Sequence, residues 1–459
     1  MVADERELVD AAVRAAIEHR KTASTRRVWP DAAALAALDE FASVSVDHPI
    51  GAERAVELLA TAGSAATVNS VGGRYFGFVN GGTTPEAYAS AVLATAWDQN
   101  VALPVMSPAA SAIDAAAATM LLDVLGLPGS ATATFCAGAT IANITAVVAA
   151  RDALLDRAGW SVDERGLGGS PSITVVTGEE AHVSALKALR IAGIGRDQVV
   201  MVPCDDRGRL DPEQMPSTSG LTLVLLQAGN VNTGHSDPFD EVIDRLDRDR
   251  SWVHVDGAFG LWANAAPERR ASVAGIERAD SWATDAHKWL NSPYDCGVVA
   301  CADGRALRRA MSMDAAYVES PDGERALMNL GLQMSQAARA VPVWAILASR
   351  GRAGIAEAVE HTCRCAERFA SRLSDQGVDV LVPVALNQAL VAFGDDSSTD
   401  AVVQGVQEAG KCWMGATTWQ GRRAMRISVS DLSTTFDDVD ASVDSILEVW
   451  GSVPRPESC

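Results

Sequence analysis

The chain has 459 residues and a formal net charge of −21, and 48% of its residues are hydrophobic. This length allows two or three domains, one of them with a large core, and the composition is typical of a helix-rich α/β enzyme rather than of a disordered or fibrous protein. The strong negative charge argues against nucleic acid and anionic membrane surfaces as main partners.

The eight cysteines are scattered, and the one close pair, Cys363 and Cys365, lacks the spacing of a zinc-binding pair. We therefore expect reduced thiols and no metal site. The N-terminus is charged from its fourth residue, which argues against a secretory signal, and no run of about 18 apolar residues predicts a membrane span. These features predict a cytoplasmic protein without a membrane partner.

Residues 1 to about 70 are alanine-rich, charged and helical in pattern. Residues 74–82, RYFGFVNGG, break that pattern because aromatic residues alternate with glycines. This favours a loop that closely approaches another group, although a packed turn between helices has the same composition.

Residues 133–143, ATFCAGATIAN, lead into a helix, and they are mostly small. Small residues at a helix start allow free backbone N–H groups to face an anion, aided by the helix dipole. Thr140 adds a hydroxyl group. Many helices also begin with small residues and bind nothing, so this pattern alone does not decide.

Strand-like residues 172–177 come before residues 179–188, where His182 lies at a strand-to-helix junction. A histidine at such a junction is often a capping or core residue. Strand-like and helix-like segments alternate between about 170 and 300, which predicts βαβ units and a mainly parallel sheet.

Within that region residues 224–226 and 253–255 have the pattern of neighbouring buried strands. Asp256 then falls at the carboxyl end of its strand, where open parallel sheets bind ligands. A buried carboxylate needs a cationic partner, and a protonated pyridine nitrogen is such a partner.

Lys288 stands between His287 and Trp289 in the segment 279–291, ADSWATDAHKWLN. Burial lowers the pKa of a lysine, so that its amine becomes a nucleophile able to hold pyridoxal 5′-phosphate (PLP) as a Schiff base. In the alternative interpretation, Lys288 caps a turn and points into water.

After residue 345 the pattern predicts a helix from Gly351 to about Leu373, several strands and a final acidic helix, which together make a small α+β domain. The predicted divisions are an N-terminal helical segment at 1–95, a large α/β domain at 96–345 and the small domain at 346–459.

The segments HVDGAF (254–259) and ADSWATDAHKWLNSPYDCG (279–297) resemble the group II PLP-dependent amino acid decarboxylases, the family of aromatic amino acid and glutamate decarboxylases. The resemblance extends from about Arg74 to Val449. It implies a fold-type I PLP-dependent α/β enzyme, with a mainly parallel sheet flanked by helices and a smaller α+β C-terminal domain. It also implies a homodimer with the active site at the subunit boundary.

The same resemblance assigns roles to individual residues. Lys288 forms the Schiff base, Asp256 keeps the pyridine nitrogen protonated, and His182 stacks on the ring, so these three are the predicted catalytic residues. Phe78 and Asn80 are predicted to contact the substrate. The predicted cofactor-binding residues are Ala139, Thr140, His182, Asp256, Ala258, His287 and Lys288.

Three stretches depart from the family pattern. Gly138-Ala139 stands where the family has two glycines or Gly-Ser, and Gln336-Ala337 stands where it has two arginines, with Arg339 as a nearby substitute. Residues 318–330 contain no tyrosine, whereas the family carries in this loop a tyrosine that protonates the reacting carbon.

The predicted reaction is decarboxylation of an L-amino acid. An apolar or aromatic substrate is favoured by Phe78 and by the absence of basic residues between Phe76 and Trp97. The alternative is oxygen-consuming decarboxylation and deamination to an aldehyde, or other quinonoid chemistry on the same scaffold. A transaminase matches the motifs less well, and a non-enzymatic ligand-binding homologue has no need to keep both Lys288 and Asp256.

Overall fold

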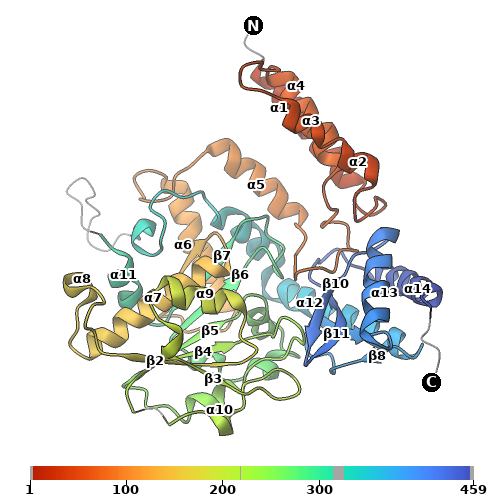
Figure 1. Ribbon diagram of the computed structural model, residues 1–459. Helices are drawn as coiled ribbons and strands as arrows, with labels where there is room; N and C mark the ends of the chain where they lie inside the picture. Colours follow the sequence, from red (N-terminus) through yellow and green to blue (C-terminus); the bar gives the residue numbers. More distant parts are fainter. Residues whose placement is uncertain (1–3, 218, 314–324, 455–459) are drawn as a thin grey trace. The chain divides into compact units, whose positions relative to one another are not determined.

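The computed structural model describes residues 4–217, 219–313 and 325–454 (Figure 1). The chain forms two compact units. One contains Met1–Gly82, Glu367–Leu381 and Leu390–Cys459, and the other contains Thr83–Ala366 and Val382–Ala389. The predicted division at 1–95, 96–345 and 346–459 remains a prediction.

The larger unit is built on a seven-stranded sheet (Figure 1). Strands β3, β2, β4, β5 and β6 run parallel, and β7 runs antiparallel to both β6 and β1. This arrangement confirms the mainly parallel sheet expected from the sequence. Across the sheet the strands are β1 (Thr132–Cys136), β7 (Gly297–Cys301), β6 (Ser281–Asp285), β5 (Ser251–Asp256), β4 (Leu221–Gln227), β2 (Ile173–Gly178) and β3 (Val199–Val202).

Several helices of this unit begin where the local sequence favours a start. Thr84 and Ser107 cap helices α5 and α6 by accepting backbone N–H bonds, and a proline follows each cap at the first helical position. The α-helices are α5 (Pro85–Trp97), α6 (Pro108–Val124), α7 (Ala139–Arg157), α8 (Val162–Arg165), α9 (Val183–Ile191), α10 (Phe239–Ile243) and α11 (Gly304–Met311). Short 3₁₀ segments are η2 (Arg196–Gln198), η3 (Pro212–Gln214), η4 (Gly260–Ala265), η5 (Arg270–Val273), η6 (Ile276–Arg278) and η7 (Leu327–Asn329).

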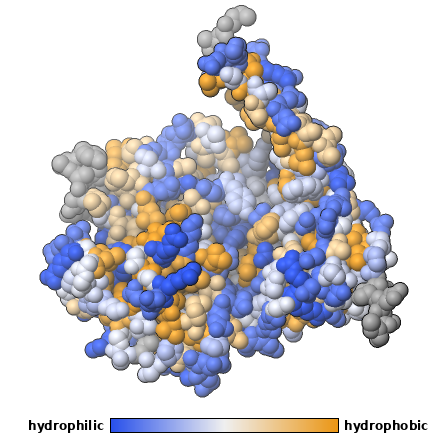
Figure 2. All heavy atoms as spheres, viewed as in Figure 1, coloured by the Kyte–Doolittle hydropathy of each residue, from blue (hydrophilic) through white to orange (hydrophobic). Residues whose placement is uncertain are grey.

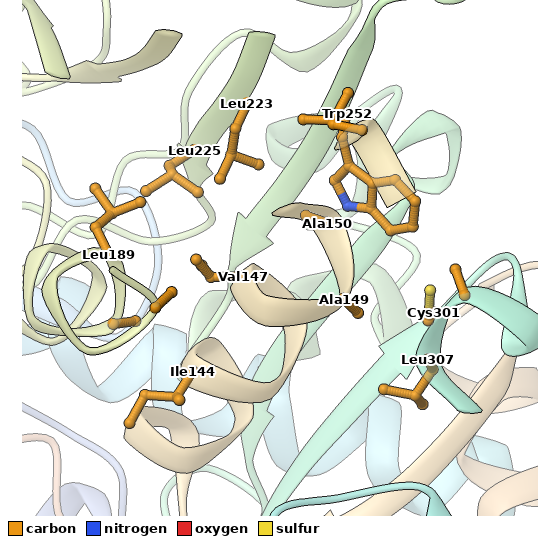
Figure 3. Packing of buried hydrophobic residues seen from close by; sticks show 14 of the residues in the cluster. Ile144, Val147, Ala149, Ala150, Leu189, Leu223, Leu225, Trp252, Cys301 and Leu307 are labelled. Carbon is orange, nitrogen blue, oxygen red and sulfur yellow. The ribbon is translucent and has the colours of Figure 1, made fainter. Parts of the chain in front are cut away.

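Helix α7 packs against the middle of the sheet. This packing holds the N-terminus of the helix at a fixed position beside the sheet. Its Val147 lies in one buried cluster with Leu225 of β4, Trp252 of β5 and Leu189 of α9 (Figure 3). Removing a buried side chain of this size costs about 2–5 kcal/mol. Because β1 ends at Cys136 and α7 starts at Ala139, the start of α7 is held close to the end of that strand.

The smaller unit contains the N-terminal helices and a four-stranded sheet in the order β10-β11-β9-β8. Its strands are β8 (Asp379–Val380), β9 (Gln388–Ala392), β10 (Gly415–Trp419) and β11 (Arg422–Ser428). Its helices are α1 (Glu5–Lys21), α2 (Ala32–Ala36), α3 (Asp39–Ser43), α4 (Ala52–Leu58), the π-helical η1 (Leu59–Gly63), α13 (Asp396–Ala409) and α14 (Phe436–Ser452). The predicted small α+β fold of the C-terminal part is present.

Helix α12 (Ala340–Ser374) consists of two helical stretches that meet in a kink at Gly351, and it passes from one unit into the other. The predicted helix from Gly351 to about Leu373 corresponds to the second of these two stretches, so its predicted start is confirmed. This glycine has φ 59° and interrupts the helical geometry at a point where the sequence suggested a beginning.

Helix α1 carries apolar residues on an exposed face. Val9, Val13 and Ile17 are spaced by four residues and are all exposed. Figure 2 shows hydrophobic residues among hydrophilic ones along the N-terminal helices. Among the helices that the structure describes, none combines the length and hydropathy required to span a bilayer.

Candidate active site

Two neighbouring parallel strands end in carboxylates at the same edge of the large sheet. Asp256 is the last residue of β5, and Asp285 is the last residue of β6. The backbone of Ala258 joins them, because its N–H donates to Asp256 and its carbonyl accepts from the N–H of Asp285. Parallel sheets bind ligands at this edge, so the predicted position of Asp256 is confirmed.

Lys288 lies in a turn just after β6, within the loop of residues 286–296 that connects β6 to β7. The N–H groups of Ala286 and His287 both donate to the carbonyl of Cys296, at 3.0 and 3.1 Å. Asn291 donates through its side-chain amide to the carbonyl of Lys288 at 3.0 Å. The turn is therefore held at both ends, and the backbone of Lys288 is fixed.

The Lys288 side chain is 21% exposed, and its Nζ lies 3.0 Å from Oδ2 of Asp285. The alternative interpretation, in which this lysine points into water, does not describe this geometry. The sequence argument considered burial alone, whereas the structure adds a carboxylate beside Nζ.

Asp256 is buried and accepts three hydrogen bonds. The donors are the amide of Asn143 at 2.9 Å, the N–H of Ala258 at 3.2 Å and the hydroxyl of Ser184 at 3.5 Å. Burial raises the pKa of Asp256 above its ordinary value, while the charges of His182 and Lys288 and the bond from Asn143 act in the opposite direction. The surroundings therefore compensate the ionised form of this carboxyl group only in part.

His182 is the N-cap of α9 and is exposed. Its Nδ1 accepts the N–H of Ser184 at 3.3 Å and lies 2.7 Å from the hydroxyl oxygen of Ser184, which in turn reaches Asp256. The capping role that the sequence left open is therefore real. Through Ser184, His182 is also linked to Asp256, and His182 and Asp256 line the same small cavity.

The start of α7 is occupied by a carboxylate from the protein itself. The N–H of Ala139 donates to Oδ1 of Asp285 at 2.6 Å. Gly138 precedes it with φ 121°, and a Cβ at this position would lie 3.3 Å from Cε1 of His287. Thr140 is half-buried in the first turn of the helix. A phosphate contact through Ala139 and Thr140 therefore requires that Asp285 share or release the N–H of Ala139.

His287 is held on two sides. Its Nδ1 accepts the N–H of Cys296 at 3.2 Å, and its ring centroid lies 4.2 Å from that of Tyr294. Burial lowers the pKa of His287, and the nearby carboxylate of Asp285 opposes this shift.

The predicted substrate residues Phe78 and Asn80 belong to the smaller unit. Phe78 has φ 54°, is exposed, and lies with its ring 5.3 Å from that of Trp413. Asn80 donates its N–H to the carbonyl of Gly77 at 3.0 Å. Their roles in substrate binding remain predictions.

Sequence reasoning gave no role to Asn143, Ser184 or Asp285, although each touches a predicted catalytic residue. For Asn143 a signal was present, since an amide between Ala142 and Ile144 in an apolar helix must find a buried partner. Near the departures from the family pattern, Arg339 pairs with Asp295 at 2.9 Å.

These residues fit PLP. The cofactor needs an amine for its aldehyde and an acid for its pyridine nitrogen. Lys288 has an amine in a position suited to this aldehyde, at the edge of the sheet where Asp256 lies. The incompletely compensated charge of buried Asp256 suits a protonated ring nitrogen.

Comparison with known proteins agrees with this geometry. Residues 69–394 match the family model for the pyridoxal-dependent decarboxylase conserved domain. The chain is 25% identical over 370 residues to an aromatic-L-amino-acid decarboxylase of Bacillus atrophaeus, covering 76% of this chain and 73% of the relative. It is 28% identical over 252 residues to an acidic amino acid decarboxylase of Xenopus tropicalis, covering 52% of this chain and 48% of the relative.

Among solved structures, Oryza sativa TDC with PLP and tryptamine has the same fold, with a TM-score of 0.89 at 21% identity and coverage of 98% of this chain and 99% of that one. This likeness confirms the fold-type I architecture. The family match covers most of the chain. The chain belongs to the pyridoxal-dependent decarboxylase family, and it is a PLP-dependent amino acid decarboxylase.

Proposed function

We propose that this enzyme decarboxylates an apolar or aromatic L-amino acid and that Lys288 holds its cofactor. The observation that carries the proposal is the placement of Asp256 at the end of β5 and of Lys288 just after the end of the neighbouring strand β6, beside Asp285, in a member of this family. Bound PLP supplies an electron sink for the electron pair released when the carboxylate leaves.

The three predicted catalytic side chains have distinct tasks. Lys288 would hold the cofactor through Nζ, which lies beside Asp285. Asp256 holds a proton at the pyridine nitrogen, because its charge is buried. His182, at the exposed start of α9, would pack against the cofactor ring and help to orient the substrate.

The remaining predicted contacts surround the cofactor. Ala139 and Thr140 offer the start of α7 to the phosphate. Ala258 fixes the direction of Asp256 through its N–H, and His287 closes the site on the side of Tyr294.

The substrate class rests on the segment after Phe76. Phe78 and Asn80 are the proposed substrate contacts, and no basic residue stands between Phe76 and Trp97 to receive an acidic side chain. The named relatives include both aromatic and acidic decarboxylases, so the proposal depends on this segment.

A second reaction is favoured by one specific observation. Residues 318–330 contain no tyrosine, and 318–324 lie outside the described residues. If no side chain delivers a proton to the reacting carbon, dioxygen and water react with the amino acid to give aldehyde, carbon dioxide, ammonia and hydrogen peroxide.

A cytoplasmic homodimer completes the proposal. Support for the dimer comes from the exposed apolar face of α1, formed by Val9, Val13 and Ile17, which a second copy could cover. The cytoplasmic location rests on the composition and on the isolated cysteines.

The test is a panel of amino acids incubated with the PLP-loaded enzyme. Carbon dioxide, amine, hydrogen peroxide and oxygen uptake are measured together. We expect phenylalanine, tyrosine, tryptophan or an aliphatic amino acid to release carbon dioxide fastest. Preference for glutamate or aspartate over all of these would refute the proposed substrate class.

A further inference from the structure

A continuous line of polar side chains crosses the buried interior behind Asp256. Trp252 donates from its indole N–H to the hydroxyl oxygen of Ser281 at 2.9 Å, and that oxygen lies 2.9 Å from Nδ1 of His254. Nε2 of His254 lies 3.0 Å from Oδ1 of Asn143, whose Nδ2 donates to Asp256 at 2.9 Å. All five residues are buried.

An ionised Asp256 fixes the direction of this chain from the carboxylate end, whereas the Trp252 end is compatible with either direction. An indole N–H can only donate, and an ionised carboxylate can only accept. Because Asn143 must turn its amide N–H toward an ionised Asp256, its Oδ1 faces His254. Nε2 of His254 must therefore carry the hydrogen, and Nδ1 accepts from the hydroxyl of Ser281.

The opposite direction requires a protonated Asp256. The acid would then donate to Oδ1 of a reversed Asn143 amide, and Nε2 of His254 would accept from that amide. The histidine hydrogen would move to Nδ1 and point at the hydroxyl oxygen of Ser281, which can accept a second bond. An ionised Asp256 therefore requires the Nε2–H tautomer of His254, and the Nδ1–H tautomer requires a protonated Asp256.

We propose that Trp252, Ser281, His254 and Asn143 form a one-directional hydrogen-bond relay that presents a fixed N–H donor to Asp256 and keeps it ionised. His254 is a positioning residue in this relay, because it acts on Asp256 only through Asn143. The inference rests on the proposed role of Asp256 toward the ring nitrogen.

The surroundings explain why the direction is stable. Burial lowers the pKa of His254 to about 4, so the ring remains neutral near pH 7 and has a single hydrogen to place. Reversing the amide of Asn143 alone would leave two acceptors facing each other at Asp256 and two donors at His254. Unpaired buried polar groups are costly, so the members must reverse together.

The first experiment reads the tautomer directly. The full-length chain is labelled with ¹⁵N-histidine, and the seven histidines are observed by NMR before and after PLP is added. The His254 signals are assigned by their loss in His254→Gln. We expect the Nε2–H tautomer in both states. The Nδ1–H tautomer in either state would overturn the relay. The spectrum recorded without PLP tests the relay even if the chain does not bind PLP.

The second experiment compares the affinity of the chain for PLP and for its analogue with carbon in place of the ring nitrogen. His254→Leu and Asn143→Leu should each reduce the preference for PLP about tenfold, since each disturbs a bond to a charged group. His254→Gln, which keeps an N–H donor, should retain the preference. The matched control is Trp282→Phe, which removes a buried indole N–H that donates instead to the carbonyl of Ile276.

Equal weakening of both cofactors in His254→Leu would overturn the relay, because a merely structural role predicts that result. A wrong assignment of the role of Asp256 would give a different experimental result from a wrong relay. In that case Asp256→Asn would leave the preference for PLP unchanged, while the tautomer of His254 would still decide the relay.

Discussion

Asp285 bridges the lysine and the helix start of the active site. One carboxylate oxygen lies 3.0 Å from Nζ of Lys288, and the other accepts the N–H of Ala139. The aldehyde and the phosphate of the cofactor are predicted to reach these same two groups, so both contacts of Asp285 must yield when PLP binds.

We predict that Asp285→Asn accelerates covalent attachment of PLP at pH 7 by about tenfold, because about 1.4 kcal/mol of attraction at a partly buried ion pair gives that factor. Stopped-flow absorbance of the cofactor measures the rate. Asp303→Asn, which alters a carboxylate that caps α11, serves as the control. Unchanged or slower attachment in Asp285→Asn would show that this carboxylate does not compete with the cofactor.

Lys288 should be the residue that binds PLP covalently. The sequence has only four lysines, at positions 21, 187, 288 and 411, so borohydride reduction followed by peptide mapping gives a clear result. We expect the label on Lys288, complete loss of labelling in Lys288→Ala, and normal labelling in Lys187→Arg. Label on any other lysine would exclude the assignment.

Asp256→Asn should bind PLP and lose at least about a hundredfold in kcat, or roughly 3 kcal/mol, since a neutral amide does not stabilise a protonated ring nitrogen. Asp280→Asn is the control. Asp280 stands just before β6, at the end of the sheet away from the active site, and its carboxylate accepts the N–H of Val253. Near-normal turnover in Asp256→Asn would contradict the proposed role.

His254 should make stability depend on pH. Burial lowers its pKa from 6.5 to about 4, so between these two pH values His254 is protonated in the unfolded chain and neutral in the folded chain. The resulting stability is present above pH 6.5 and is lost as the pH falls toward 4, by about 2 kcal/mol between pH 7 and pH 5.

Urea unfolding at the two pH values measures this contribution. His254→Gln should remove it, whereas His48→Gln, at an exposed position, should not. The same pH dependence in wild type and His254→Gln would mean that His254 does not titrate in this way.

The product ratio should respond to the loop without tyrosine. A tenfold ratio between amine and aldehyde requires only about 1.4 kcal/mol between the two barriers, so one proton donor can decide it. We expect oxygen uptake with the wild type and a shift toward amine when a tyrosine is introduced within 318–330. Amine alone in air with the wild type would show that another group protonates the carbon.

The sequence was sufficient for the parts of the site that depend on local pattern. Alternation of strands and helices gave the parallel sheet, and the apolar run before Asp256 placed this residue at a strand end. The contacts of Asp285 with Ala139 could not be predicted, because they join residues 146 positions apart through the packing of α7 on the sheet. The boundary at Gly351 could be predicted because a glycine often marks a helix end, whereas the helical stretch before it was not predicted.

The reversal of direction at β7 has a consequence for how the enzyme can evolve. A parallel neighbour of β6 would need a crossover of a dozen or more residues, whereas Lys288 sits in a hairpin between antiparallel strands. Gly297 opens β7 opposite Asp285, and a Cβ there would come within 2.4 Å of the backbone of Gly138. Lengthening this hairpin or slipping its register by one residue would turn β7 over and press side chains into α7. New substrate specificities are therefore expected to arise from other loops, while the length of this hairpin stays constant.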